Sequence, residues 1–468
     1  MDVAPLLQPV GWFFVCYFVL INGSYLLVHG VALLEVRRNL HEGRTDPAYD
    51  LQDSPFIPGI AVVVPAYNEA PVIASSVQSL LSLEYPDVEV VVVNDGSTDG
   101  TLERLREAFD LQRVEAEYPL DAPCEPIEGV YRASDVDLVV LDKANGGKAD
   151  ALNAGVFFTD QPLFCAVDAD TIIERAALIE VVRPFLRDPD RVIATGGTVR
   201  VANGCRFRNS LVERVGLADS WLVNLQTMEY LRAFLSGRIG LSRIRSLLVV
   251  SGAFGVFRTN AVREIGGYST DTITEDMEIV VRLHRHFLEA DREYRVEFVP
   301  DGVVWTEVPE TWGSLGRQRS RWYRGLLETL LLHRAMIGRP KYGVVGLVGV
   351  PFYLFVEALG PIVEGLGYVV VPVAFALGLL NVPFFVLFLA VAVGLGTLMS
   401  WLGVFTEALA FRRYEDPRDI AALLGYGLLE NVLYRQWKAF IAWKGLGQLL
   451  RGDTSWGEMA RSGIEEED

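Results

Sequence analysis

Phe-Cys-Ala-Val-Asp-Ala-Asp-Thr, residues 164–171, is the stretch of sequence on which the fold prediction rests. An apolar run over 163–167 ends in two carboxylates, Asp168 and Asp170. The run is too short for a helix of its own and therefore predicts a buried strand. Because side chains alternate along a strand, the two carboxylates would share one face if extension continues. At the carboxyl end of a strand they would project into the crevice where open α/β sheets bind ligands.

The chemistry of this carboxylate pair leaves two interpretations open. Two hard oxygen donors suit Mg²⁺ or Mn²⁺ holding a diphosphate. An isolated Asp-x-Asp is more often a solvated turn than a metal site, because Asp is a favoured turn residue. The remainder of the chain has to decide between them.

Strands and helices alternate on either side of this stretch. The apolar runs 61–64, 88–93 and 138–141 predict further strands, and residues with helical spacing lie between them. This alternation predicts an α/β domain with a mostly parallel sheet and right-handed crossovers. Each predicted strand ends in a polar turn, at the edge of the sheet where nucleotides bind.

Size and charge narrow the classes of function. A chain of 468 residues has room for more than one domain, and its net charge of −18 argues against a nucleic-acid partner. The four cysteines form no Cys-x-x-Cys pair, so they indicate neither a zinc site nor a disulfide framework.

The two ends of the chain are apolar. Residues 11–34 are long enough to span a bilayer and are followed by Arg37 and Arg38, which predicts a signal anchor with the next segment in the cytoplasm. Residues 350–379 and 383–411 predict two more spans, whereas charges within 420–450 favour an interfacial or re-entrant segment, with a fourth span as the alternative. The expected domains are a transmembrane anchor (1–38), a cytoplasmic α/β domain (39–304), interfacial helices (305–342), C-terminal transmembrane and interfacial helices (343–450) and a cytoplasmic tail (451–468).

Two turns of the central domain carry candidate ligands for a nucleotide. Asp95 follows the strand at 88–93 and would bond a base or ribose, as acidic residues do on other doubly wound sheets. Lys148 would reach a phosphate from the start of a helix. Taken singly, the first segment is also an ordinary turn with a helix cap, and the second residue an ordinary solvated lysine.

Three later segments complete the set of candidates. Small residues at 251–254 would let a second substrate lie against the backbone, or form a tight packing corner. Asp276 would be a general base, although Thr-Glu-Asp at 274–276 also resembles a capped helix start. At 318–322, Arg319 and Arg321 would neutralise a diphosphate, or the segment would be an amphipathic helix on the membrane surface.

Together these motifs resemble the inverting, processive family 2 glycosyltransferases, namely the cellulose, chitin, hyaluronan and poly-N-acetylglucosamine synthases. The resemblance covers about residues 60–325. It implies a GT-A fold, Mg²⁺ or Mn²⁺ and a nucleotide-diphosphate-sugar donor, usually UDP-linked. It implies a metal ligand at Asp170 and a catalytic base at Asp276 beside Glu275. The implied donor-binding residues are Pro65, Tyr67, Glu69, Asp95, Lys148, Asp168, Gln318, Arg319, Arg321 and Trp322; the implied acceptor-binding residues are Ser251, Gly252, Ala253, Phe254 and Trp322.

The function implied is inverting transfer of sugars from a UDP-sugar to a growing β-linked polysaccharide, coupled to its translocation across the membrane. The protein would be a multi-pass protein of the inner or plasma membrane, with accessory export subunits as further expected partners. The segment 456–461 is loosely similar to the gating loop of hyaluronan synthases. Two alternatives stay open: transfer of one sugar to a lipid acceptor, and a non-catalytic membrane scaffold that keeps the fold.

Overall fold

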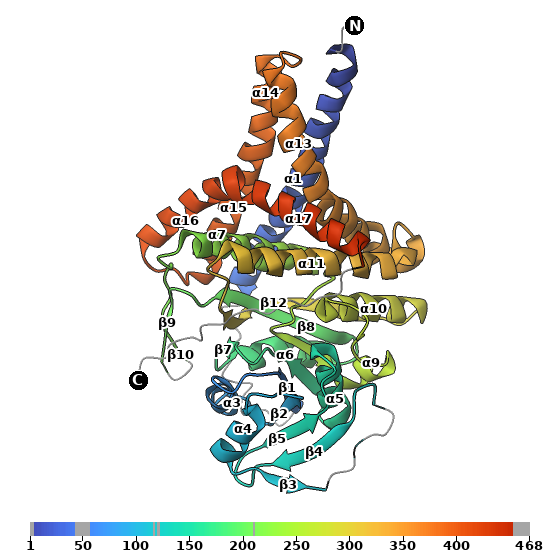
Figure 1. The fold of residues 1–468 in the computed structure, drawn as a ribbon, viewed down its shortest axis with the longest axis vertical. Helices are drawn as coiled ribbons and strands as arrows, with labels where there is room; N and C mark the ends of the chain where they lie inside the picture. Colours follow the sequence, from blue (N-terminus) through green and yellow to red (C-terminus); the bar gives the residue numbers. More distant parts are fainter. Residues whose placement is uncertain (1–3, 43–56, 116–117, 119–121, 209–210, 453–468) are drawn as a thin grey trace.

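A computed structural model describes residues 4–42, 57–115, 118, 122–208 and 211–452, so segment 456–461 lies outside the described residues. Figure 1 shows an α/β domain at one end of the molecule and a column of helices at the other. The amino-terminal helix α1 (Ala4–Glu42) runs through that column toward the domain.

One mixed sheet forms the centre of the α/β domain. Its strand order is β3-β4-β5-β2-β1-β6-β11-β8-β12-β7, and β1, β2, β5 and β6 are parallel neighbours. The strands are β1 (Ile60–Ala66), β2 (Val88–Asp95), β3 (Gln112–Val114), β4 (Ile127–Arg132), β5 (Leu138–Lys143), β6 (Leu163–Ala166), β7 (Ile172–Ile173), β8 (Val192–Val201), β11 (Gly255–Arg258) and β12 (Arg295–Thr306); β9 (Arg206–Arg208) and β10 (Leu211–Arg214) pair separately. The four strands expected from the sequence are therefore present, and they form one parallel block; β8 and β12 form a second parallel pair.

Helices cover both faces of the sheet. Val62 and Val64 pack on one face with α3 and α4, whereas Val63 packs on the other with α5, as the alternation of side chains requires. Strand β1 is almost wholly apolar because both of its faces are covered. The helices of the domain are α3 (Ile73–Leu81), α4 (Thr101–Phe109), α5 (Lys148–Phe158), α6 (Ala177–Arg187), α7 (Trp221–Glu229), η2 (Tyr230–Gly237), α8 (Arg238–Arg243), α9 (Thr259–Glu264) and α10 (Glu275–Glu289).

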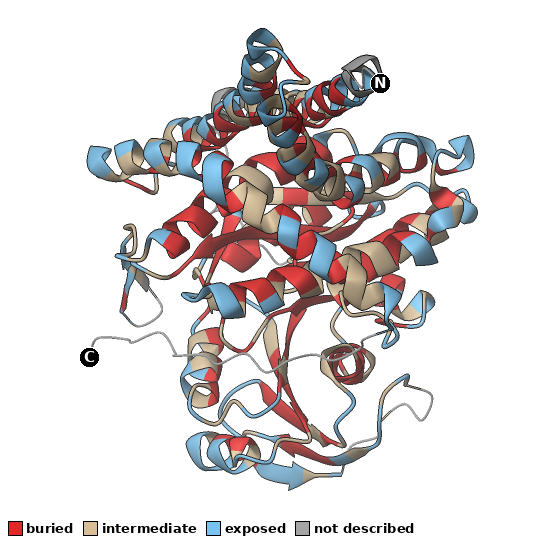
Figure 2. Cartoon of the chain, turned by 45° about the horizontal axis from the view of Figure 1, so that its top comes forward, coloured by how far each residue is buried: buried red, intermediate tan, exposed pale blue. Residues whose placement is uncertain are grey.

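Three helical segments are long and apolar enough to cross a membrane: Pro9–Arg38, Val345–Ala376 and Val382–Phe411. They correspond to the three expected spans. Figure 2 shows exposed residues along the outer sides of these helices, whereas the central strands of the sheet are buried and the edge strand β3 is exposed. The elements from α11 onward are α11 (Trp312–Leu332), η3 (Arg334–Met336), η4 (Pro340–Tyr342), η5 (Val345–Gly349), α12 (Val350–Phe352), η6 (Tyr353–Ala358), α13 (Leu359–Ala376), α14 (Val382–Leu389), η7 (Ala390–Gly394), α15 (Leu395–Thr406), η8 (Glu407–Phe411), α16 (Pro417–Leu429), η9 (Glu430–Tyr434) and α17 (Arg435–Leu450).

The segment 417–450 is one long helix that lies across the direction of α1 (Figure 1). None of it falls among the three membrane-spanning candidates found in the described residues. Whether residues 420–450 form an interfacial segment or a fourth span stays a prediction.

Two ion pairs join the sheet to the end of the third apolar helix. Arg200 of β8 contacts Glu407 at 2.7 Å, and both side chains are buried. Arg413 contacts Glu174, beside β7, at 2.9 Å. The carboxyl-terminal part of the sheet is therefore held against the helical column.

Candidate active site

The loop before α5 is fixed by Asp95, the last residue of β2. The Asp95 carboxylate accepts hydrogen bonds from Lys143 Nζ at 2.7 Å, Gly146 N at 2.9 Å and Gly147 N at 2.8 Å. Asp95 is only 3% exposed, so its carboxylate is buried beneath the loop that it holds. Its contacts support a positioning role, in which it sets the loop that leads into Lys148. The expected contact of Asp95 with the nucleotide stays a prediction.

Lys148 is the point at which separate segments meet. Its ammonium contacts Asp168 Oδ1 at 2.6 Å and Glu275 Oε1 at 3.1 Å, so the start of α5, the end of β6 and the start of α10 come together. The neighbouring carboxylates raise the pKa of Lys148 despite the opposing effect of burial, and the group stays charged at neutral pH.

Asp276 lies in the first turn of α10, beside Lys148. Its Oδ2 accepts a hydrogen bond from Gly252 N at 3.0 Å, and its Oδ1 from Met277 N at 2.9 Å. Burial and the adjacent Glu275 charge raise the pKa of Asp276 above the usual value for an aspartate. A carboxylate of increased basicity is suited to removing a proton from a hydroxyl.

Asp168 and Asp170 follow β6 and are both partly exposed. Among the described residues no group of three or more His, Cys, Asp or Glu side chains forms a closed metal site. Mg²⁺ commonly takes one or two carboxylates and completes its coordination with substrate phosphates and water. Two accessible carboxylates at the carboxyl end of a strand therefore fit an ion that arrives with a diphosphate.

The segment after β1 is held against the turn after β2. Asn68 N donates to Ser97 Oγ at 3.0 Å, and Glu69 N donates to Thr101 Oγ1 at 3.0 Å. This places Pro65, Tyr67 and Glu69 at the carboxyl edge of the sheet, where Tyr67 is 52% exposed. Their contact with a donor stays a prediction.

The segment 251–254 passes directly over the charged cluster. A side-chain carbon added at Gly252 would lie 3.2 Å from Lys148 Nζ and 3.5 Å from Asp276 Oδ2, so the glycine allows this close approach. Ser251 and Ala253 flank it, and their acceptor contacts stay a prediction. The prediction that Phe254 contacts the acceptor is wrong. Its ring is fully buried in the space left by Gly197 and Gly302, so an acceptor cannot reach it.

The segment 318–322 lies on α11, which runs beneath the helical column (Figure 1). Arg319 is buried, contacts Glu229 Oε2 at 2.9 Å and stacks over the Trp322 ring at 4.1 Å. Gln318 accepts a hydrogen bond from Arg319 at 3.1 Å, and Arg321 is partly exposed. The structure thus gives Arg319 an internal partner, and diphosphate binding by this segment stays a prediction.

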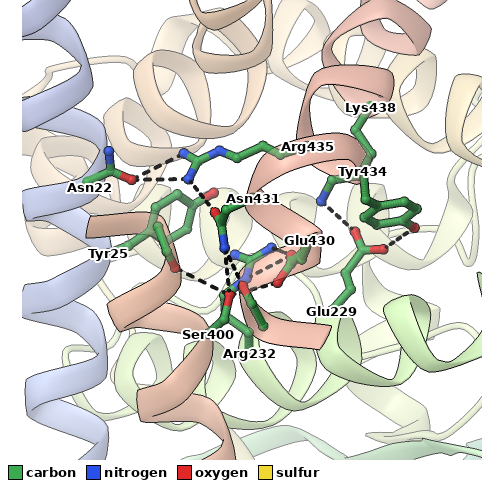
Figure 3. Close-up of polar contacts among 12 residues, drawn as sticks. Asn22, Tyr25, Glu229, Arg232, Ser400, Glu430, Asn431, Tyr434, Arg435 and Lys438 are labelled. Atoms are coloured by element: carbon green, nitrogen blue, oxygen red, sulfur yellow. Dashed lines mark hydrogen bonds and ion pairs between the residues drawn. The ribbon is translucent and has the colours of Figure 1, made fainter. Parts of the chain in front are cut away.

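Glu229 also belongs to a set of buried charges that we call the interhelical network (Figure 3). Lys438 Nζ and the Tyr434 hydroxyl donate to Glu229 at 3.0 Å and 2.8 Å. The other ion pairs of the network are Arg232 with Glu430 at 2.9 Å and Arg435 with Glu364 at 3.0 Å. Sequence reasoning missed Glu229, because only the fold brings α7, α11 and α17 together.

Arg238, at the start of α8, is a second residue that sequence reasoning missed. Its guanidinium lies over the Phe234 ring at 4.6 Å, and the Phe234 ring lies 5.8 Å from that of Trp322. Each of Arg238 and Asp276 influences the pKa of the other, which places both charges in one electrostatic environment. The arginine lies in a helical stretch that holds other arginines, and no local motif marks it.

Comparison with known proteins agrees with this geometry. Residues 61–266 match the sequence profile described as Glycosyl transferase family 2. Residues 61–266 are therefore similar to a family 2 glycosyltransferase domain. Poly-β-1,6-N-acetyl-D-glucosamine synthases are similar: that of Staphylococcus epidermidis is 30% identical over 275 residues, 59% of this chain and 56% of the relative, and that of Staphylococcus aureus (strain COL) is 32% identical over 277 residues, 58% and 56%. The match therefore spans little more than half the length of these relatives.

A solved structure supports the fold of this family 2 domain. The mannosyltransferase PcManGT of Pyrobaculum calidifontis, in complex with GDP-Man and Mn²⁺, superposes with a TM-score of 0.52 at 20% identity, covering 90% of this chain and 99% of that one. This likeness confirms the expected GT-A fold. The family 2 resemblance expected from the sequence is likewise found over residues 61–266, whereas the roles of its motifs stay predictions.

Proposed function

We propose that the protein transfers sugars, with inversion, from a UDP-sugar to the end of a growing β-linked polysaccharide and moves the product into the membrane. One observation carries this proposal. Lys148, Asp168 and Asp276 come from three distant segments and meet at one edge of the sheet, beneath Gly252. A base, a fixed cation and metal-binding carboxylates are the groups that displacement of a diphosphate requires.

In the reaction, Asp276 accepts the proton of an acceptor hydroxyl. The acceptor oxygen bonds to the anomeric carbon as the bond from that carbon to the diphosphate oxygen breaks. Lys148, held by Asp168 and Glu275, supplies positive charge near the leaving group. Asp170 and Asp168 would hold Mg²⁺ or Mn²⁺, which neutralises diphosphate charge when bound. Attack opposite the leaving group gives a β-linkage from an α-linked donor.

The names of the relatives make N-acetylglucosamine the first sugar to test and a β-1,6-linkage the first product. The three apolar helices support a multi-pass membrane protein. The positive charges of Arg37 and Arg38 after the first helix support a catalytic domain on the cytoplasmic side of the membrane, where it would meet its nucleotide-sugar donor. We also propose that accessory export subunits bind the protein.

The test is incorporation of radiolabelled sugar by the purified protein in lipid nanodiscs with Mn²⁺. UDP-N-acetylglucosamine is compared with other UDP-sugars, and the product is sized and digested with linkage-specific hydrolases. Long, hydrolase-sensitive chains are expected. A single added sugar on lipid would replace the polymer proposal with the lipid-acceptor one, and no transfer from any donor would favour the scaffold.

A further inference from the structure

Arg238 is a buried cation without a counter-ion. It is 7% exposed, and among the described residues it forms no ion pair, while its Nη1 has no hydrogen-bond partner. Arg200 and Arg319 also have unpartnered nitrogens, but each of them contacts a glutamate. A buried charge is costly unless it is paired or hydrogen-bonded, so an orphaned guanidinium beside an active site indicates a missing ligand.

The surroundings of Arg238 place it on the membrane side of the base. Gly240, two residues along α8, packs against the Val28 backbone of α1 so closely that an added carbon would lie 2.2 Å from it. Lys148, at the start of α5, lies between Asp276 and Asp168, the carboxylate that follows β6. Asp276 therefore has a cation on the donor side and a different cation toward the helical column.

The aromatic neighbours of Arg238 complete a surface suited to a sugar. Arg238 lies on Phe234, and the Phe234 ring lies beside that of Trp322, a partly exposed residue with Arg319 over its ring. Sugar sites commonly combine an aromatic face for the ring with directed donors for its oxygens. A guanidinium that keeps an unused N–H provides such a donor.

We propose that Arg238 binds the acceptor, donating a hydrogen bond from Nη1 to a hydroxyl or amide oxygen of its terminal sugar and so positioning the attacking hydroxyl at Asp276. This inference rests on the proposed function. It makes Arg238 a determinant of acceptor affinity, separate from the donor residues around Lys148. Because the charge of Arg238 lowers the pKa of Asp276, removal of that charge changes the electrostatics of proton transfer.

The test compares Arg238→Ala, Arg238→Lys and the matched control Arg243→Ala in nanodiscs. Arg243 lies on the same helix, is 52% exposed and pairs with Glu35. The probes are a β-1,6-linked N-acetylglucosamine pentasaccharide and UDP, with binding measured by calorimetry and transfer by radiolabel. Arg238→Ala is expected to weaken pentasaccharide binding by about 10- to 100-fold, the range for a hydrogen bond to a charged group, with UDP affinity within about twofold.

The pH dependence of the transfer rate distinguishes a direct role of Arg238 in the active site from a general loss of structure in the variant. Without the Arg238 charge, the acid limb of the transfer rate moves to higher pH, whereas Arg238→Lys keeps that limb and still loses pentasaccharide affinity because it lacks the guanidinium fork. Equal weakening of UDP binding would assign Arg238 to the diphosphate and overturn the inference. Unchanged pentasaccharide binding in Arg238→Ala, or none in the wild type, also overturns it. A wild type that binds both probes but transfers nothing defeats the proposed function alone.

Discussion

Charge is arranged differently at the active-site edge of the sheet and in the interhelical network. At the sheet edge, Lys148 faces Asp168, Glu275 and Asp276, and the carboxylates outnumber the cation. In the network, Glu229, Glu364 and Glu430 each contact an arginine or lysine and are buried. The first arrangement leaves negative charge for a metal ion and a proton, whereas the second leaves little for a ligand. We infer that carboxylates in excess of cations mark the chemistry, whereas carboxylates that each have a cationic partner mark the scaffold.

The sharpest test of this contrast is Asp276→Asn. The asparagine keeps the size of the side chain but cannot accept the proton, so polymer formation should fall by about a hundredfold to ten-thousandfold. UDP affinity should change by less than about threefold, because the donor contacts are elsewhere. Radiolabel incorporation and calorimetry measure the two quantities. Normal turnover in this variant would remove Asp276 from the role of base.

Loss of the metal should produce the next largest effect. Chelation, or Asp170→Asn, is expected to lower the transfer rate by about a hundredfold, because the leaving diphosphate loses several kcal/mol of charge stabilisation. Added Mn²⁺ should restore the chelated wild type but not the variant. Asp160→Asn is the control, since Asp160 is an exposed aspartate outside the site. Full activity of Asp170→Asn in chelator would contradict a metal-dependent site.

A substitution in the interhelical network should lower the stability of the protein without changing its affinity for UDP. Glu430→Gln leaves Arg232 buried without its counter-ion, which typically costs about 3–5 kcal/mol. Thermal unfolding in nanodiscs should show a lower transition temperature, while the folded fraction keeps its affinity for UDP. Glu107→Gln on α4 is an exposed control. An unchanged transition temperature together with lost UDP binding would move the network into the active site.

The smallest predicted effect is a shift in pH dependence. Because burial and Glu275 raise the pKa of Asp276, the transfer rate should fall as pH drops through a value above the usual aspartate range. Glu275→Gln removes one like charge and should move this acid limb to lower pH. The charges of Lys148 and Arg238 also influence the pKa of Asp276, and the charge of Asp276 influences the pKa of Tyr353. These three residues are kept unchanged in this comparison. An acid limb that moves to higher pH in Glu275→Gln would contradict the assignment.

Local patterns were enough to predict the parallel block of the sheet formed by β5, β2, β1 and β6. Its strands are short apolar runs whose alternation with helices is visible in the residues, and each polar turn marks a strand end. The antiparallel strand β11, inserted between β6 and β8, was not predicted, because pairing between distant strands leaves no local signal. The same reason explains Phe254, whose motif indicated an acceptor contact but whose ring fills the space above two distant glycines.

The sequence by itself determined the family 2 domain, the apolar helices and the identity of the charged groups, because motif spacing and hydropathy are properties of neighbouring residues. Only the tertiary structure decided which charges face one another. Asp95 and Arg319 are given internal partners, Arg238 is left without one, and Asp276 is set beside Lys148. Electrostatic interactions depend on distance and burial, and both are fixed when segments far apart in the chain pack together.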